Sequence, residues 1–498
     1  ESQINFNTTS TALHEAEIYS GGFPSAVIID PDLFPVNQGE NTLAIQVHNY
    51  SNTSSDLSCI PFLTFGYNTE VQDIRVPDER MELPNTFLHT NFKISSSGED
   101  ILLSDNMNQR LDSIYSGQIQ TDMSLGKIIE EETWALFSEP TPGEENLTSS
   151  FLGILQKPSF SMESGFYNDN QLILEINQET EFSNTYYTLD GSEPDQNSTQ
   201  YDAPFSIIEN SVVRAKSFLE NWYSSDTESK TYILGEDAPG DLPVIFLTTD
   251  HNSFFDQDTG LYVMGPSASN DFPYFGSNFW EDWERPIHFE LVDPNREGYA
   301  ADAGVKIFGG WSRAFPQKSL SFFSRSYLGP SSFEYSFFPN SDISSYEAFV
   351  LRNSGNDWES TVLRDGFTTS LTENLNIDHQ QYRPAVLYIN GDFWGIQNLR
   401  EKINEHFIAS NHNIDAQYVD LLVGGGFLDE EIVHGTNTDY INLIGYVESN
   451  DMNDDIVENA IENWVDIESF LSYFAFQIFI DNRDWPGNNI KFWRDSRP

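Results

Sequence analysis

Short runs in which apolar and polar residues alternate fill the first half of the chain, and Gly, Pro, Asn and Ser separate them. The clearest run contains Leu43, Ile45 and Val47, which alternate with small or polar residues. A period of two is typical of a β-strand with one buried face, and the separating residues favour turns. The pattern therefore predicts several all-β units before about residue 235.

From residue 236 the pattern becomes mixed, after a segment rich in Gly, Pro and acidic residues at 235–241 that we interpret as a linker. Apolar runs at 242–250, 259–265 and 283–293 predict the strands of one sheet. Residues 464–480 are longer and mostly apolar, and Asp466 near their start suits a helix N-terminus. They predict a buried helix that supports the loop after it, too short and too interrupted by polar residues to cross a bilayer.

The predicted fold is multidomain, with N-terminal all-β sandwiches followed by an α+β domain. At 498 residues the chain is long enough for three or four domains with their own cores. Its 24 basic and 78 acidic residues give a formal net charge of −54. Such a surface repels nucleic acid and anionic membranes, so we expect no nucleic-acid partner. The sequence contains no apolar run of membrane length, so we expect no membrane span. A single cysteine, Cys59, excludes an intramolecular disulfide but not secretion.

The C-terminal residues 480–498 carry the first candidate chemistry. Asp484 follows Arg483, and Asn489 comes five positions after Asp484. Phosphotransferases place one carboxylate beside the attacking hydroxyl and an amide oxygen on the magnesium ion at this spacing. A polar turn between a helix and a strand is the alternative interpretation of the same residues.

A glycine hairpin supplies the second candidate. Residues 304–308 predict a strand that meets Gly309 and Gly310, where the backbone can approach a phosphate without an intervening Cβ. After Ser312 and Arg313 a second strand begins with Lys318. Kinases cover and hold nucleotide phosphates with such a hairpin and strand lysine. An ordinary hairpin with a surface lysine is the alternative.

Three N-terminal segments resemble known β modules. Residues 1–69, with GENTLAIQVHNYSNTSSDLS, resemble part of a galactose-binding-like jelly roll. Residues 70–153, with FKISSSGEDILLSD and PTPGEEN, resemble the immunoglobulin-like lamin-tail domain, and residues 154–235, with YYTLDGSEPD, resemble the β-sandwich at the C-terminus of chitobiase and hexosaminidases. The resemblances imply spacer or adhesive modules and a polysaccharide as a candidate partner. Asp190 and Asp195 allow a calcium interpretation, but D-G-S and E-P favour turns.

The final segment, 236–498, resembles the CotH kinase family of atypical protein kinases related to spore coat protein H. The motifs PQKSL, RNSGND, RPAVLYINGDFWGIQNLREKI and RDWPGNN carry the resemblance, which covers about 243–494. It implies that Lys318 contacts the nucleotide phosphates and that Asp365, on a helix at 360–374, orients this lysine. It further implies a strand at 386–388 before a turn at Asn390 and Gly391, a hinge near Glu401 and Lys402, Asp484 beside the acceptor hydroxyl, and Asn489 or Asn488 on magnesium.

One family feature is missing. CotH kinases continue into a second metal-binding aspartate in a W-D-x-D context, and Asp495 lies too close to Asn489 to replace it. We therefore expect the sequence to be a piece of a longer polypeptide, with a catalytically dead protein as the alternative. The resemblance implies a bacterial, extracellular or cell-surface enzyme that uses ATP and magnesium to phosphorylate Ser or Thr of surface or matrix proteins. The alternative is an inactive structural or adhesive protein that uses the kinase fold as a scaffold and binds glycans.

Overall fold

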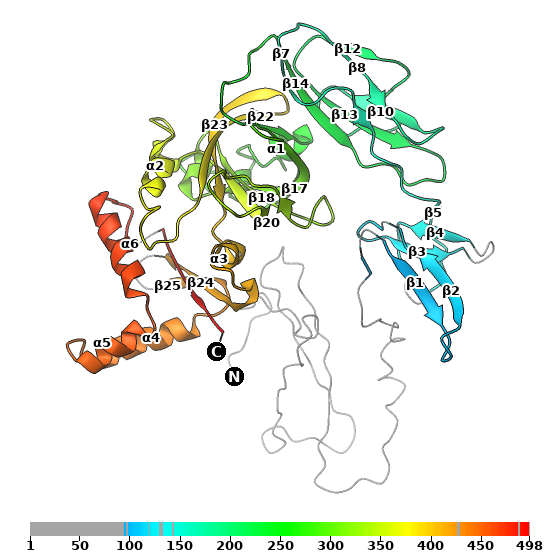
Figure 1. The fold of residues 1–498 in the computed structure, drawn as a ribbon. Helices are drawn as coiled ribbons and strands as arrows, with labels where there is room; N and C mark the ends of the chain where they lie inside the picture. The colour runs from blue at the N-terminus through cyan, green and yellow to red at the C-terminus, as the bar shows by residue number, and fades with distance from the viewer. Residues whose placement is uncertain are drawn as a thin grey trace. The chain divides into compact units, whose positions relative to one another are not determined.

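The computed structural model describes residues 94–497 except 96–97, 118, 129–132, 142–143, 426–428 and 487–488. Figure 1 draws the remaining residues as a thin grey trace. The predicted jelly roll at 1–69 and the beginning of the 70–153 unit lie outside the described residues. Cys59 lies outside them as well.

Two small antiparallel sheets occupy the described part of the predicted lamin-tail segment. Strands β1 (Asp100–Ser104) and β2 (Arg110–Tyr115) form a hairpin. Strands β3 (Ser124–Lys127), β4 (Trp134–Phe137) and β5 (Ser150–Phe151) form a sheet in that order. The buried side chains of Ala135, Leu136 and Phe137 belong to β4. The all-β content agrees with the predicted fold class, whereas the lamin-tail assignment stays a prediction.

The next unit is a β-sandwich built around a five-stranded sheet in the order β11-β10-β13-β14-β7. In the central strand β13 buried and partly buried residues alternate from Val213 to Phe218, as is typical of a strand with one buried face. Pairs β6–β9 and β8–β12 complete the unit. The bounds are β6 (Ser159–Phe160), β7 (Gly165–Tyr167), β8 (Leu172–Leu174), β9 (Ile176–Asn177), β10 (Asn184–Thr188), β11 (Thr199–Gln200), β12 (Phe205–Ile207), β13 (Ser211–Phe218) and β14 (Glu228–Leu234).

The two aspartates that allowed a calcium interpretation form turns. The Asp190 carboxylate accepts hydrogen bonds from the backbone N–H and the hydroxyl of Ser192. Asp195 accepts from the backbone N–H groups of Asn197 and Ser198. These are Asx turns, in which the side chain replaces a backbone acceptor. The turn interpretation is confirmed.

Seven strands then close into a barrel in the order β15-β16-β17-β18-β21-β23-β22, with β15 and β22 parallel and the other neighbours antiparallel. Its interior is aromatic, with the Phe289, Phe322 and Phe349 rings in mutual contact. The strands are β15 (Val244–Thr248), β16 (Arg285–Val292), β17 (Tyr299–Phe308), β18 (Ser319–Phe323), β21 (Ala348–Arg352), β22 (Tyr382–Ile389) and β23 (Asp392–Glu401). Outside them lie α1 (His251–Phe255), η3 (Asn278–Trp280), η4 (Trp311–Ala314), β19 (Phe333–Glu334), β20 (Ser345–Tyr346), η5 (Gly355–Asp357) and α2 (Arg364–Ser370).

The barrel confirms most of the predicted strands and corrects two elements. Asn390 and Gly391 have φ of +49° and +84°, so the predicted type I′ turn joins β22 to β23. Residues 259–265, predicted as a strand, form turns instead, and the consecutive residues Leu261 and Tyr262 both pack into the barrel core. The predicted helix at 360–374 is limited to α2, because Val362, before it, has a left-handed backbone and turns follow it.

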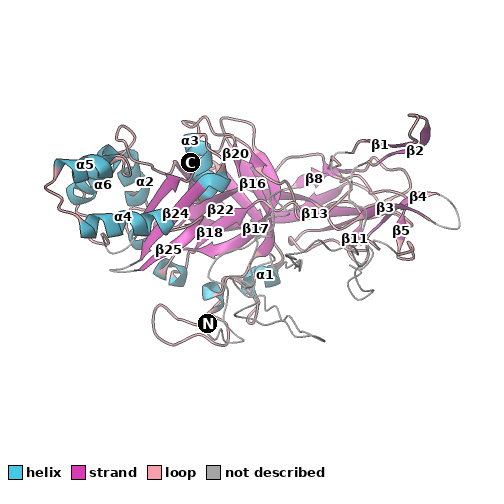
Figure 2. Cartoon of the chain, turned by 90° about the horizontal axis from the view of Figure 1, so that it is seen from below, coloured by secondary structure: helices cyan, strands magenta, loops and turns pink. Residues whose placement is uncertain are grey.

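The C-terminal part combines a three-stranded sheet, in the order β25-β24-β26, with four helices. Figures 1 and 2 show α4, α5 and α6 on the side of β24 and β25. The β-rich N-terminal part followed by an α+β part confirms the predicted fold class. No helix among the described residues is long and apolar enough to cross a membrane. The bounds are α3 (Glu405–His412), η6 (Ala416–Tyr418), β24 (Val419–Gly425), β25 (Asp429–His434), α4 (Thr438–Ser449), α5 (Asp455–Glu462), α6 (Ile467–Phe479) and β26 (Ile490–Asp495).

Helix α6 confirms its predicted start and corrects its predicted burial. Asp466 caps the helix, because its carboxylate accepts a hydrogen bond of 2.9 Å from the Ser469 backbone N–H. None of its residues is buried, however, and Ile478 and Phe479 are 70% and 80% exposed. The prediction took hydrophobic composition as burial, whereas burial requires neighbours that the described residues do not supply here.

Candidate functional site

The two residues predicted for phosphotransfer, Asp484 and Asn489, lie side by side between α6 and β26. Asp484 accepts a hydrogen bond of 2.6 Å on Oδ2 from the Asn489 side-chain amide. Asn489 has a φ of +61°, a left-handed conformation that asparagine tolerates better than most residues. Both side chains are exposed, so a substrate hydroxyl has access to them. Asn488, the second candidate for magnesium, lies outside the described residues.

Helix α6 positions this Asp484/Asn489 pair. The ring of Trp485, next to Asp484, lies edge-on against Phe474 at a centroid distance of 4.9 Å. Tyr473, on the same helix, contacts Trp485 at 6.3 Å. The Asp484 backbone N–H donates to the Asn482 side-chain oxygen at 3.1 Å. Helix α6 therefore contacts the loop directly through Tyr473, Phe474 and Trp485, as expected of a support, although the helix is not buried.

The predicted glycine hairpin joins β17 to β18 and is closed by its own side chains. Gly309 has a φ of +105°, which strains any residue with a Cβ, and a Cβ there would lie 2.8 Å from the Ser312 hydroxyl oxygen. Arg313 donates from Nε to the Gly309 carbonyl at 2.5 Å, and its guanidinium lies 5.7 Å from the centre of the Trp280 ring. Gly310 precedes the helical turn η4. Arg313 is thus bound within the hairpin in this structure.

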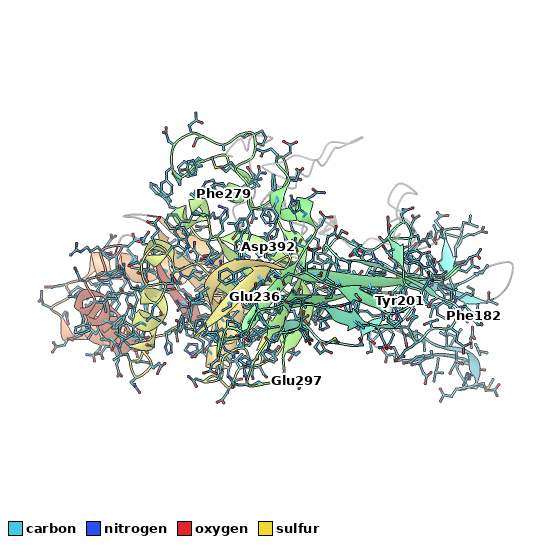
Figure 3. The ribbon with its side chains drawn as sticks, turned by 90° about the horizontal axis from the view of Figure 1, so that it is seen from above. Phe182, Tyr201, Glu236, Phe279, Glu297 and Asp392 are labelled. Atoms are coloured by element: carbon cyan, nitrogen blue, oxygen red, sulfur yellow. The ribbon has the colours of Figure 1, made fainter. Side chains whose placement is uncertain are left out.

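Lys318 is also bound within the hairpin. It is only 4% exposed, and its Nζ donates to the Arg313 and Phe315 carbonyls at 2.7 and 3.0 Å. The ammonium group lies 3.9 Å from the centre of the Phe279 ring, which Figure 3 labels. Burial lowers the pKa of Lys318 to about 8. A nucleotide phosphate would have to replace both carbonyl contacts to meet this lysine.

Asp365, which the resemblance to CotH kinases places beside Lys318, pairs with two other cations in this structure. Its carboxylate forms ion pairs with Arg352 at 2.7 Å and with Arg400 at 2.5 Å. Although burial opposes ionisation, these two guanidinium groups lower the pKa of Asp365. Asp365 thus pairs with two arginines and not with Lys318, because β21 and β23 bring Arg352 and Arg400 next to α2. The sequence alone gave no means of choosing among these cations.

Glu401, predicted near a hinge, ends β23 where the barrel leads into α3. It is 2% exposed and accepts a hydrogen bond of 2.8 Å from the Gln381 backbone N–H. Burial raises the pKa of the Glu401 carboxyl. Together with Lys402, Tyr346 and His406, it lines a small cavity between the barrel and α3.

Three lysines, Lys306, Lys402 and Lys491, meet outside the barrel, and of these the sequence placed only Lys402, near a hinge. Their rarity in the sequence could have pointed to them. Only four lysines follow residue 300, these three and Lys318. In a chain with 78 acidic residues, each lysine of a phosphate-handling domain is informative.

The donor set for magnesium is small. Among the described residues, no group of three or more His, Cys, Asp or Glu side chains could hold a metal ion. Asn489 offers a single amide oxygen, whereas magnesium takes six oxygen ligands, several of them water or phosphate. The described residues therefore do not form a complete magnesium site by themselves.

Comparison with known families adds to this geometry. Residues 305–498 match the family model of the CotH kinase protein, and residues 162–229 match that of the chitobiase/beta-hexosaminidase C-terminal domain. A search of curated proteins found no significant match. The CotH match begins within β17, so β15 and β16 precede it although they are part of the same barrel. The chain thus carries a CotH kinase-like domain at 305–498, preceded by a chitobiase/hexosaminidase C-terminal β-sandwich.

Proposed function

We propose that this chain is a protein kinase that transfers the γ-phosphate of ATP to Ser or Thr hydroxyls, with Asp484 aligning or deprotonating the acceptor hydroxyl. The contact between Asp484 and Asn489 carries the proposal, because it brings both predicted phosphotransfer residues together in a CotH kinase-like domain. An exposed carboxylate beside an amide suits an acceptor hydroxyl on one side and a phosphate on the other. Magnesium is the expected metal, with Asn489 as one of its ligands.

The proposed setting is extracellular or on a bacterial cell surface, with surface or matrix proteins as acceptors. The net charge of −54 and the β-sandwich at 162–229, a module type that accompanies carbohydrate-active domains, support this setting. A polysaccharide is a second candidate partner for the β modules. Polysaccharide pull-down with residues 154–235 intact and deleted tests that partner.

The second candidate function is that of an inactive structural or adhesive protein with a kinase-like scaffold. The enclosure of Lys318 by two carbonyls and an aromatic ring supports it, because this lysine would then serve folding alone. The described residues also lack a group of three metal-binding side chains.

The deciding experiment measures phosphate transfer from γ-labelled ATP, with magnesium, to the chain itself and to a mixture of surface proteins. Asp484→Asn should lower the transfer rate by about 10²- to 10⁴-fold, the range for a positioned acid or base. The matched control is Asp481→Asn, which changes an aspartate that is 74% exposed and paired with Arg483. Equal rates for Asp484→Asn and the wild type would refute the role of Asp484. A wild-type chain without transfer would favour the scaffold function.

A further inference from the structure

Lys306, Lys402 and Lys491 converge on one edge of the barrel. Lys306 lies on β17, Lys402 follows the last residue of β23, and Lys491 lies on β26. The ammonium groups of Lys306 and Lys402 lie 5.9 and 5.3 Å from the centre of the same ring, that of Phe323. Lys491 donates from Nζ to the carbonyl of Ile403, the neighbour of Lys402, at 2.7 Å. We refer to these three residues as the lysine cluster.

The cluster brings like charges together in a chain that is poor in lysine. Lys402 forms no ion pair with any carboxylate of the described residues, and its ammonium group lies 5.1 and 5.3 Å from the centres of the Phe308 and Phe323 rings. Burial and the positive charges of Lys491 and Lys306 lower the pKa of Lys402 to about 8, against the opposing effect of Glu405 and Asp282. A partly buried ammonium group without a direct counter-ion opposes folding.

The acidic residues around the cluster pair with Lys306 and Arg325 but not with Lys402. Asp282 lies 3.1 Å from Lys306, and Glu284 lies 4.0 Å from Lys306 and binds Arg325 through two hydrogen bonds of 2.7 and 2.8 Å. Glu405 and Glu431 raise the pKa of Lys491 through their charge, against the effect of burial. The nearby acids therefore do not supply a direct partner for Lys402 within the described part of the chain.

We propose that the lysine cluster, with Lys402 at its centre, binds the phosphate groups of the nucleotide. Lysine is a compact point charge that binds phosphate oxygens, and Lys402 has no carboxylate partner among the described residues, while Lys306 and Lys491 add positive charge beside it. Lys491 lies only two positions after Asn489 in the sequence. The chain therefore links the lysine cluster directly to the Asp484/Asn489 pair. The proposal rests on the proposed phosphotransfer function and assigns its nucleotide-binding residues. It replaces Lys318, whose ammonium group is already bound to two carbonyls.

Calorimetric titration of the whole chain with sodium tripolyphosphate, and separately with ATP, tests the assignment at low salt. We expect Lys402→Gln to weaken binding of both at least about tenfold, equivalent to one charge-assisted hydrogen bond. Lys402→Arg should keep most of the affinity because it keeps the charge. The matched control is Lys157→Gln, which removes a lysine that is 47% exposed near the start of the β-sandwich unit and should leave the affinity unchanged.

Three results would overturn the proposal: no binding of tripolyphosphate by the wild type, unchanged affinity in Lys402→Gln, or loss of affinity in Lys318→Gln alone. Circular dichroism of each variant shows whether it is folded, and Lys306→Gln provides a second variant of the cluster. Asp484→Asn separates the two proposals, because it should bind tripolyphosphate like the wild type while losing transfer. If Asp484→Asn keeps transfer and Lys402→Gln loses binding, the role of Asp484 fails and the phosphate site stands.

Discussion

Two partly buried lysines in different regions of the molecule have opposite surroundings. Lys230, on β14 of the sandwich, lies 2.9 Å from Glu290 of the barrel strand β16 and 2.9 Å from Glu163. Although burial alone would lower its pKa, the charge of Glu290 raises it. Lys402, at the edge of the barrel, faces two aromatic rings and two other lysines, and its pKa is lowered. One lysine is neutralised by its neighbours, and the other is not.

Lys230 lies at the contact between the β-sandwich and the barrel, which we call the sandwich–barrel boundary. The groups around it stabilise the fold. Glu290 also accepts a hydrogen bond of 2.5 Å from the Ser164 hydroxyl, and an apolar cluster that includes Ile233, Phe246 and Tyr388 packs beside it. The sandwich is therefore joined to the barrel through buried contacts on both sides of the predicted linker. The Lys402 site lacks such neutralisation, and a cost to stability that the fold retains is typical of a binding site. The comparison separates lysines that serve folding from lysines available to a ligand.

The largest expected effect on stability comes from breaking the boundary. Lys230→Met should lower the free energy of unfolding by about 3–5 kcal/mol, because it leaves the Glu290 carboxylate buried without its partner. Urea unfolding followed by tryptophan fluorescence measures the loss. Because the pKa of Lys230 is raised, its contribution is fully present below the pKa of an unfolded lysine and is lost only as the pH rises through the higher folded value. A loss below about 1 kcal/mol would place Lys230 among ordinary surface lysines.

Lys402→Met is expected to raise the free energy of unfolding, whereas Lys230→Met lowers it. A fall in pKa from 10.5 to about 8 corresponds to roughly 3 kcal/mol of opposition to folding, present in full below pH 8. The unfolded chain binds more protons between these two values, so wild-type stability should rise with pH across that interval. Lys402→Met should unfold at higher urea than the wild type at pH 7 and show a smaller rise between pH 8 and 10. A variant less stable than the wild type at pH 7 would show that Lys402 serves folding.

The smallest effect on stability is expected from changing Glu163, at the exposed side of the sandwich–barrel boundary. Glu163 binds the same Lys230 ammonium group as Glu290, but its side chain is 83% exposed while that of Glu290 is 8% exposed. Glu163→Gln should therefore change the free energy of unfolding by less than about 1 kcal/mol, as for surface ion pairs. Glu290→Gln is the matched variant and should fall in the range of Lys230→Met. Equal losses for the two glutamates would mean that burial does not decide the strength of this network.

The sequence determined the features of this protein that depend on neighbouring residues. Alternation in β13, the type I′ turn at Asn390 and Gly391, and the Asp466 cap all follow from local backbone and hydrogen-bonding rules. The Asp484/Asn489 pair belongs with them, because five positions of chain keep the two side chains within reach of each other. The motifs for the CotH kinase-like and chitobiase-like domains likewise lie along continuous segments.

Only the tertiary structure decided which charges meet across long stretches of sequence. It paired Asp365 with Arg352 and Arg400 in place of Lys318, and it left α6 exposed although its composition is apolar. It also brought Lys306, Lys402 and Lys491 together from β17, the end of β23 and β26. Strand order, register and barrel closure determine which of these side chains lie close together, and all three depend on the packing of the whole domain. Coulomb energy then acts on the distances that packing has fixed, which no local pattern encodes.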